Sequence, residues 1–426
     1  MKNKMLKIAI VTPEFVTEST FDGGLANYTY RLAKSLLDFG HKPVVFVASN
    51  VTEQLFLENI EVQRVLIDRY DDWLYSNKYL SIPYARVKRF LYKPLKISER
   101  EVTISLKRQS AKLNKSLMSI HMKESFDIVH YANLGSVGYY KSKNIPSVAR
   151  LSGSNAIWFE YGGYGETKKQ VNRMDELEMS SLKKMDDIFG PCKSISDMVE
   201  VKINRKIELI ESLYINEVVQ DDLSVYNEFL KDKKYLLFFG TVSQVKGIGT
   251  ISEIIHSFFK LYPDYYFVVV GKNSHSITPG ITMLEILKEK AKEYKDHVIY
   301  LNQLPHSKLF PVLNNAEFVV LPSRIDNFPN TCVESMAHGK IVIGTIGNGF
   351  EQLIVDGESG FLINVDDSDM LLKRIIHVLN LNNEEKKQIE MNAKERIELL
   401  KPNHIIPKII GFYERAIEKF NTKRKR

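Results

Sequence analysis

Residues 321–361 read LPSRIDNFPNTCVESMAHGKIVIGTIGNGFEQLIVDGESGF, and this stretch decides the fold class of the chain. Residues 318–321 predict a short buried strand, which Pro322 ends because proline cannot donate to a strand ladder. Turn-forming residues follow, and from Thr331 apolar side chains recur at helical spacing until Gly339. The stretch therefore predicts a strand, a loop and a helix N-terminus, with the next buried strand at residues 341–343.

Two acidic residues flank the predicted helix start. Asp326 precedes it, and Glu334 follows about one turn inside the helix. Free N–H groups and the positive end of the helix dipole favour phosphate at such a start, and a carboxylate there can accept hydrogen bonds from two ribose hydroxyls. The alternative is that both carboxylates only cap and charge the helix. A turn at residues 347–349 brings Glu351 to the same strand ends, where ligands of open α/β sheets bind, and this convergence favours a ligand site.

The stretch resembles the donor-binding signature of the retaining glycosyltransferases of family four (glycosyl transferases group 1). These enzymes have the GT-B fold, an α/β architecture of two facing Rossmann-like, doubly wound domains with an interdomain cleft. The family pattern has two acids with seven residues between them, a small-residue helix, a glycine turn and a further Glu. Asp326 stands here for the usual first Glu, at the same spacing from Glu334.

The resemblance implies roles for these residues. Glu334 holds the ribose, Asp326 faces the donor sugar, and Glu351 belongs to the donor site. The main chain of the loop contacts sugar hydroxyls and phosphate through Phe328, Pro329, Asn330 and Thr331. The donor is then a nucleotide-diphosphate sugar, UDP- or GDP-linked, which is a substrate and not a cofactor.

Two glycine sites support a phosphate ligand. Gly23 and Gly24 precede a predicted helix, where they let backbone approach a ligand closely, although a plain turn is the alternative. Residues 240–247, GTVSQVKG, follow the first strand of the second domain. The family has an arginine and a lysine in this loop, both directed at the distal phosphate. Lys246 matches the lysine and is expected to neutralise the leaving diphosphate, whereas Thr241 replaces the arginine.

The acceptor side departs from the family pattern as well. Many members carry a His-Gly pair after the strand at residues 146–151, and this chain has Ser152 there. In the retaining mechanism that the resemblance implies, the departing phosphate accepts the proton of the acceptor. Arg150 is assigned to the acceptor side with Ser152, and the alternative is that Arg150 supports the fold.

The remaining chain alternates strands and helices, which is typical of doubly wound parallel sheets. We predict an N-terminal Rossmann-like acceptor-side domain at residues 1–215 and a nucleotide-sugar domain at residues 216–405. Residues 207–215 are predicted as a strand with its exit, and residues 216–234 as a linker with one short helix. A C-terminal helix at residues 406–426 is expected to pack back towards the first domain.

Composition limits the setting. The two cysteines, Cys192 and Cys332, are too few for a disulfide framework, which favours a cytoplasmic protein. We expect no metal, because the Asp367-Ser368-Asp369 string is better explained as a helix N-cap, and the sequence shows no His or Cys cluster. The formal net charge is +7, with basic and aromatic residues interleaved between Arg86 and Arg108. That segment predicts peripheral contact with the inner face of the membrane, a solvated insertion being the alternative.

The sequence therefore predicts a retaining, metal-independent glycosyltransferase. Its acceptor is a glycan or lipid-linked molecule, in cell-surface polysaccharide or glycolipid synthesis, and nucleic acid is not an expected partner. Two alternatives remain: a GT-B-type nucleotide-sugar epimerase and a catalytically inactive nucleotide-sugar-binding protein. The departures at Ser152, Thr241 and Asp326 keep the second alternative open.

Overall fold

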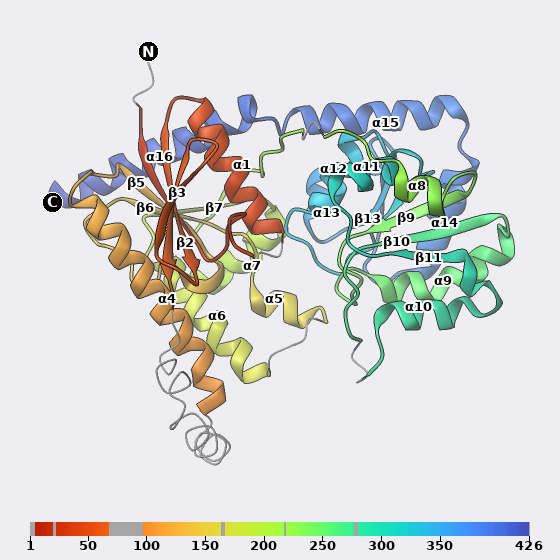
Figure 1. The fold of residues 1–426 in the computed structure, drawn as a ribbon, viewed down its shortest axis with the longest axis horizontal. Helices are drawn as coiled ribbons and strands as arrows, with labels where there is room; N and C mark the ends of the chain where they lie inside the picture. The colour runs from red at the N-terminus through yellow and green to blue at the C-terminus, as the bar shows by residue number, and fades with distance from the viewer. Residues whose placement is uncertain are drawn as a thin grey trace.

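The computed structural model describes residues 5–19, 23–67, 97–162, 167–216, 219–276 and 280–425. They form two α/β domains, each built on one sheet, that lie side by side (Figure 1). Of the basic segment predicted to contact a membrane, Arg86 to Arg108, residues 86–96 lie outside the described residues. Within the described ranges, no helix is long and apolar enough to cross a membrane.

The N-terminal sheet has the order β3-β4-β2-β1-β5-β6-β7-β8, and all neighbours are parallel except the β3–β4 hairpin. Its inner strands are nearly continuous apolar runs because helices cover both faces of a parallel sheet. The strands are β1 (Lys7–Thr12), β2 (Lys42–Ser49), β3 (Glu53–Leu57), β4 (Ile60–Leu66), β5 (Ile128–Ala132), β6 (Ser147–Arg150), β7 (Asp187–Gly190) and β8 (Glu208–Leu209).

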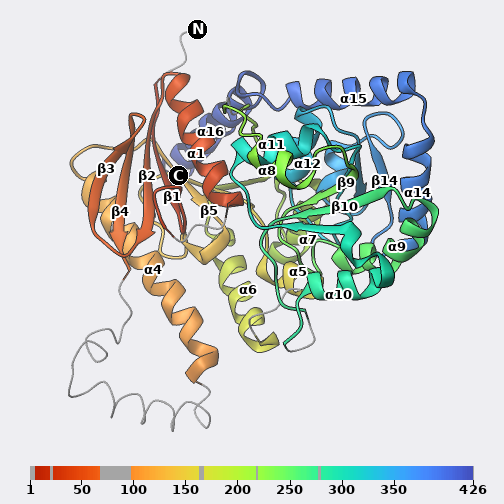
Figure 2. The same ribbon diagram turned by 45° about the vertical axis from the view of Figure 1, so that its right-hand side comes forward.

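Helices pack on this sheet and extend between the domains. Figure 2 shows α5, α6 and α7 on the side of the N-terminal domain that faces the C-terminal domain. The helices of the N-terminal domain are α1 (Gly24–Asp38), α4 (Ile97–His121), η1 (Leu134–Ser136), α5 (Asn155–Glu160), α6 (Lys168–Lys183) and α7 (Lys193–Ile203).

The C-terminal sheet is parallel throughout, with the order β11-β10-β9-β12-β13-β14. Its strands are β9 (Lys234–Phe239), β10 (Tyr265–Val270), β11 (Val298–Leu301), β12 (Val319–Val320), β13 (Val342–Thr345) and β14 (Phe361–Ile363). Its helices are α8 (Ser224–Phe229), α9 (Ile248–Leu261), α10 (Met283–Ala291), η2 (Lys292–His297), α11 (His306–Asn314), α12 (Asn330–Ala337), α13 (Gly349–Leu353), α14 (Ser368–Asn380) and α15 (Asn383–Glu398).

One predicted strand is much shorter than expected. Of residues 207–215, only Glu208 and Leu209 belong to the sheet, as β8. The apolar residues after them are buried for another reason: they cross towards the C-terminal domain, and the Tyr214 N–H donates to the Leu400 carbonyl at 2.8 Å. An apolar run indicates that a segment is buried but not that it is a strand, and here the segment is buried at the junction of the two domains.

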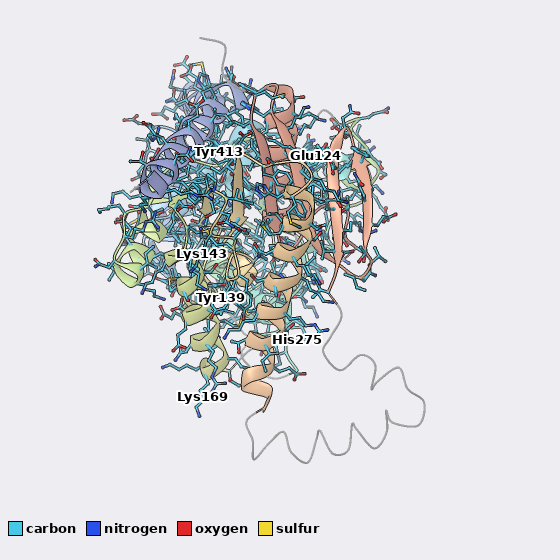
Figure 3. All side chains as sticks on the ribbon, turned by 90° about the vertical axis from the view of Figure 1, so that its left-hand side faces the viewer. Glu124, Tyr139, Lys143, Lys169, His275 and Tyr413 are labelled. Carbon is cyan, nitrogen blue, oxygen red and sulfur yellow. The ribbon has the colours of Figure 1, made fainter. Side chains whose placement is uncertain are left out.

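The last helix, α16 (Pro402–Lys425), runs from the C-terminal domain back to the N-terminal sheet (Figure 1). Because α16 begins at Pro402, the domain boundary predicted after residue 405 falls inside this helix. Figure 3 shows Tyr413 on α16 beside the N-terminal strands. The Tyr413 hydroxyl lies 2.5 Å from Nδ1 of the buried His130, and Arg415 and Lys419 form ion pairs with Glu208 and Asp187. These contacts hold α16 on the first domain.

Candidate active site

Two adjoining cavities lie between the domains. The larger, of about 500 Å³, is lined by apolar side chains of α5, α6 and α7 together with residues of loops from both domains, and we call it the apolar cavity. The smaller, of about 400 Å³, extends from the start of α1 to the start of α12, and we call it the polar cavity. Residues that line both are Leu134, Ser152, Lys246, Asp326 and Asn327. The two cavities therefore meet at four polar side chains and Leu134.

An ion pair occupies this meeting point. Nζ of Lys246 pairs with Oδ2 of Asp326, and the two side chains are 32% and 14% exposed. Their loops are fixed to each other: the Arg324 N–H donates to the Val245 carbonyl at 2.8 Å. Gly247 has φ +82°, and a Cβ there would lie 1.9 Å from the Pro322 carbonyl oxygen. Only glycine permits that approach, so the glycine at position 247 fixes where the neighbouring Lys246 lies.

Most of the predicted site residues line the polar cavity. They are Gly24, Arg150, Ser152, Thr241, Lys246, Asp326, Phe328, Pro329, Asn330 and Thr331. Gly23 is the N-cap of α1, directly before Gly24. A Cβ on Gly24 would meet no atom within 4 Å, so this backbone is open to a ligand. The structure thus brings together loop residues that are far apart in the sequence.

Two predicted acids lie outside both cavity linings. Glu334 is buried in α12, with Oε1 3.8 Å from Nε2 of His306, the first residue of α11. The His306 ring stacks on Phe310 at 4.9 Å between centroids. Glu351 is exposed in α13, and its Oε2 accepts a hydrogen bond from the Gly347 N–H at 2.6 Å. The Glu334 carboxylate therefore lies near His306 rather than on either cavity wall, whereas the Glu351 carboxylate stabilises its own turn.

Asparagine side chains hold the main chain around Ser152. Oδ1 of the buried Asn133 accepts the Ser152 N–H at 2.6 Å, and Nδ2 of Asn133 donates to the Gly153 carbonyl at 2.6 Å. Asn327 binds the same segment from the other domain, since its Nδ2 donates to the Leu151 carbonyl at 3.0 Å. The segment that replaces the family His-Gly pair is thus rigidly positioned between both cavities.

Arg150 is buried below this segment, at 5% exposure. Its Nη1 donates to Oγ of Ser152 at 2.8 Å and its Nη2 to Oγ of Ser212 at 2.6 Å. The guanidinium carbon lies 3.6 Å from the ring centroid of Tyr28, on α1. Burial lowers the pKa of Arg150 from its ordinary value, and no described carboxylate hydrogen-bonds it. Sequence reasoning missed Tyr28 and Ser212, because nothing in their local sequence marks them as cavity residues.

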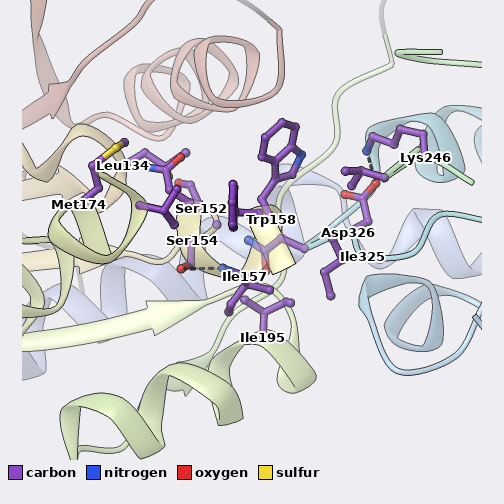
Figure 4. A pocket seen from close by; sticks show the side chains of 16 residues that line it. Leu134, Ser152, Ser154, Ile157, Trp158, Met174, Ile195, Lys246, Ile325 and Asp326 are labelled. Atoms are coloured by element: carbon purple, nitrogen blue, oxygen red, sulfur yellow. Dashed lines mark hydrogen bonds and ion pairs between the residues drawn. The ribbon is translucent and has the colours of Figure 1, made fainter. Parts of the chain in front are cut away.

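The apolar cavity was not predicted from the sequence. Trp158 lies at its wall, 42% exposed, between the Ser152–Ser154 segment and the Lys246–Asp326 pair (Figure 4). Ser154 caps α5, and its Oγ accepts the Ile157 N–H at 3.5 Å. Other apolar lining residues are Leu134, Ile157, Phe159, Val171, Met174, Ile195, Val245 and Ile325. Trp158, the fourth residue of the capped helix α5, is the one sequence feature that could have indicated this wall.

A buried carboxyl lies behind this wall. Glu178 of α6 is 1% exposed, and its Oε1 accepts a hydrogen bond at 2.7 Å from Nδ2 of Asn155, which lines the apolar cavity. Burial, with a smaller contribution from the charge of Asp175, raises the pKa of Glu178 to about 8. Glu178 is therefore mostly protonated at neutral pH.

Comparison with known proteins defines the class. Residues 219–396 match the family model of the glycosyl transferases group 1. The sucrose-phosphate synthase of Thermosynechococcus elongatus superposes with a TM-score of 0.69 over 97% of this chain and 99% of its own, at 17% identity. This chain is a GT-B glycosyltransferase.

Curated relatives agree with this class. The glycosyltransferase is 24% identical to an uncharacterized glycosyltransferase of Methanocaldococcus jannaschii over 80% of this chain and 85% of that protein. It is 25% identical to the alpha-monoglucosyldiacylglycerol synthase of Acholeplasma laidlawii over 60% of this chain and 67% of that protein. The predicted fold class and enzyme class are confirmed. Among the residues that the structure describes, this glycosyltransferase has no group of three or more His, Cys, Asp or Glu side chains suited to a metal ion.

Proposed function

We propose that this glycosyltransferase moves a sugar from a nucleotide-diphosphate donor to a glycan or lipid-linked acceptor, with retention at the anomeric carbon. The observation that carries the proposal is the Lys246–Asp326 pair at the meeting point of two chemically different cavities. The polar cavity suits a phosphorylated sugar, because it combines the start of α12 with cationic side chains. The apolar cavity suits an acceptor that carries apolar groups.

In the reaction, the bond between the anomeric carbon and the donor phosphate oxygen breaks. The acceptor oxygen forms the new bond on the same face, and its proton passes to the departing phosphate. Lys246 offsets the negative charge that develops on that phosphate, and a preorganised cation is worth most in a site that excludes water. Asp326 orients Lys246 and accepts hydrogen bonds from donor-sugar hydroxyls.

Several residues outside the reacting centre complete the assignment. Glu334, beside His306, binds the ribose hydroxyls, and the donor nucleotide is UDP or GDP. The similarity to an alpha-monoglucosyldiacylglycerol synthase supports an acceptor at a membrane surface, in glycolipid or cell-surface polysaccharide synthesis. The enzyme then works at the cytoplasmic side of the membrane.

The test combines donor binding with turnover. The purified protein is screened for thermal stabilisation by UDP-, GDP- and ADP-sugars, since a ligand that binds only the folded state raises stability. Each donor that binds is then incubated with vesicles containing diacylglycerol and with short oligosaccharides, and nucleoside diphosphate release is measured. Product anomers are assigned by NMR coupling constants. Acceptor-dependent release with a retained anomer supports the proposal, and an inverted product or the absence of donor binding overturns it.

A further inference from the structure

Three residues that line the polar cavity each have a buried polar atom with no hydrogen-bond partner among the described residues. The atoms are the Tyr28 hydroxyl oxygen, Nε of Arg150 and Oδ1 of Asn327. Nearly all buried polar groups in folded proteins are paired, so unpaired ones that line one cavity indicate a missing ligand. Two of the three, on Tyr28 and Arg150, are hydrogen-bond donors, and their side chains are in contact.

The hydrogen bonds described for Arg150 go to neutral groups. Nη1 and Nη2 donate to two serine hydroxyls, and the guanidinium lies over the Tyr28 ring. A buried cation is costly unless an anion compensates it. Lys246 is already paired with Asp326, whereas the described hydrogen bonds of Arg150 include no carboxylate.

We propose that Arg150 and Tyr28 form the N-terminal half of a clamp for the donor diphosphate, opposite Lys246. In this arrangement Nε of Arg150 and the Tyr28 hydroxyl donate to phosphoryl oxygens, and Arg150 supplies the second positive charge that Thr241 does not provide. Asn327 Oδ1 accepts a hydrogen bond from a sugar hydroxyl. This inference rests on the proposed function and names the residues that recognise its donor.

The position of the pair selects the donor over a phosphorylated acceptor. Arg150 and Tyr28 line the polar cavity together with Gly24, Thr241 and the first residues of α12, but they do not line the apolar cavity. Tyr28 remains a donor at neutral pH, because burial raises the pKa of its hydroxyl.

The test measures binding of UDP, GDP and ADP by calorimetry, with the matching nucleoside monophosphates as reference. Tyr28→Phe removes only an unpaired hydroxyl, so it should fold as the parent does and weaken diphosphate binding about 5- to 20-fold. Arg150→Met should weaken it more than about 30-fold, and Arg150→Lys should recover part of the loss. Monophosphate binding should change less than about threefold. Adding Thr241→Arg to Arg150→Met should restore diphosphate affinity.

The outcomes distinguish a donor clamp, an acceptor anion site and a failure of the proposed function. Unchanged diphosphate affinity in Tyr28→Phe overturns the clamp and leaves the proposed function intact, and it does so even if the Arg150 variants do not fold. If Tyr28→Phe instead weakens glucose 6-phosphate binding in the presence of saturating nucleoside diphosphate, the anion belongs to the acceptor and the clamp is wrong. If the parent protein binds none of the three diphosphates, the proposed function itself fails.

Discussion

Nζ of Lys246 and Oδ2 of Asp326 form an ion pair although 80 residues separate them in the sequence. Sheet order explains the pairing: β9 and β12 are neighbouring parallel strands, and the loops that carry the two residues both leave the carboxyl ends of those strands. The pair lies on the C-terminal domain and faces two cavities whose other walls come from the N-terminal domain. Under the proposed function, catalysis depends on a charge held by one domain and a substrate enclosed by both.

Lys246→Ala is expected to lower kcat/KM for sugar transfer about 100- to 1,000-fold, because the departing phosphate loses its cation and meets an unpaired Asp326 carboxylate. Initial rates of nucleoside diphosphate release measure the effect. Lys206→Ala, at a side chain that is 93% exposed, is the matched control and should leave the rate unchanged. Transfer at the parental rate by Lys246→Ala would refute the assignment.

Trp158→Ala is expected to raise the KM for the acceptor about 10-fold while donor affinity stays the same, since Trp158 lines the apolar cavity and not the polar one. Stability should change by no more than about 1 kcal/mol, because the indole is already partly exposed. Acceptor and donor titrations of the initial rate separate the two effects. Phe56→Ala, an exposed aromatic on β3, controls for general loss of surface apolar area; a change in donor KM alone would argue against an acceptor role.

Glu178 makes the stability of the N-terminal domain depend on pH. Its folded pKa, about 8, lies above the value of an ordinary carboxyl, so the folded state holds a proton that the unfolded state releases between about pH 4.5 and 8. Folding stability from this group is complete below about pH 4.5 and is lost as pH rises through 8. Glu178→Gln should therefore be more stable than the parent at pH 9, by on the order of a few kcal/mol, and similar to it at pH 5.

Urea unfolding at pH 5, 7 and 9 measures this difference. Glu176→Gln is the control, because Glu176 lies on the same helix but is exposed. A constant difference between Glu178→Gln and the parent at all three pH values would show that Glu178 does not hold the proton.

Tyr413→Phe should destabilise the protein by about 1–3 kcal/mol, because it leaves Nδ1 of the buried His130 without its partner hydroxyl. Burial, reinforced by the charge of Arg150, lowers the pKa of His130 to about 3, so the ring is neutral at neutral pH. The lost hydrogen bond is therefore one between two neutral groups. In hydrogen-exchange measurements, the amides of α16 should exchange faster in Tyr413→Phe than in the parent, and those of α15 should change less. Tyr140→Phe, at an exposed tyrosine, is the control and should change neither the stability nor the exchange of α16. Equal protection of α16 in Tyr413→Phe and in the parent would mean that this hydrogen bond does not hold the helix.

Local sequence pattern was sufficient for the elements around the site. The prolines and glycines that bound residues 321–361 predicted β12, α12 and β13, and the structure has them within a few residues of the predicted positions. Asp367 is the N-cap of α14, as predicted, with its carboxylate accepting the Met370 N–H at 2.9 Å. These features depend on hydrogen bonds and steric limits within a few residues, which a sequence window contains.

The sequence by itself determined the alternation of strands and helices, the class of two mainly parallel sheets and the loop residues at the strand ends, because backbone propensity and apolar periodicity act locally. Only the tertiary structure decided that Lys246 pairs with Asp326, that Arg150 stacks on Tyr28 without a carboxylate partner, and that Trp158 lines a cavity beside them. Sheet order and the direction of each side chain set these contacts. Both arise from the packing of distant segments, so no local pattern encodes them.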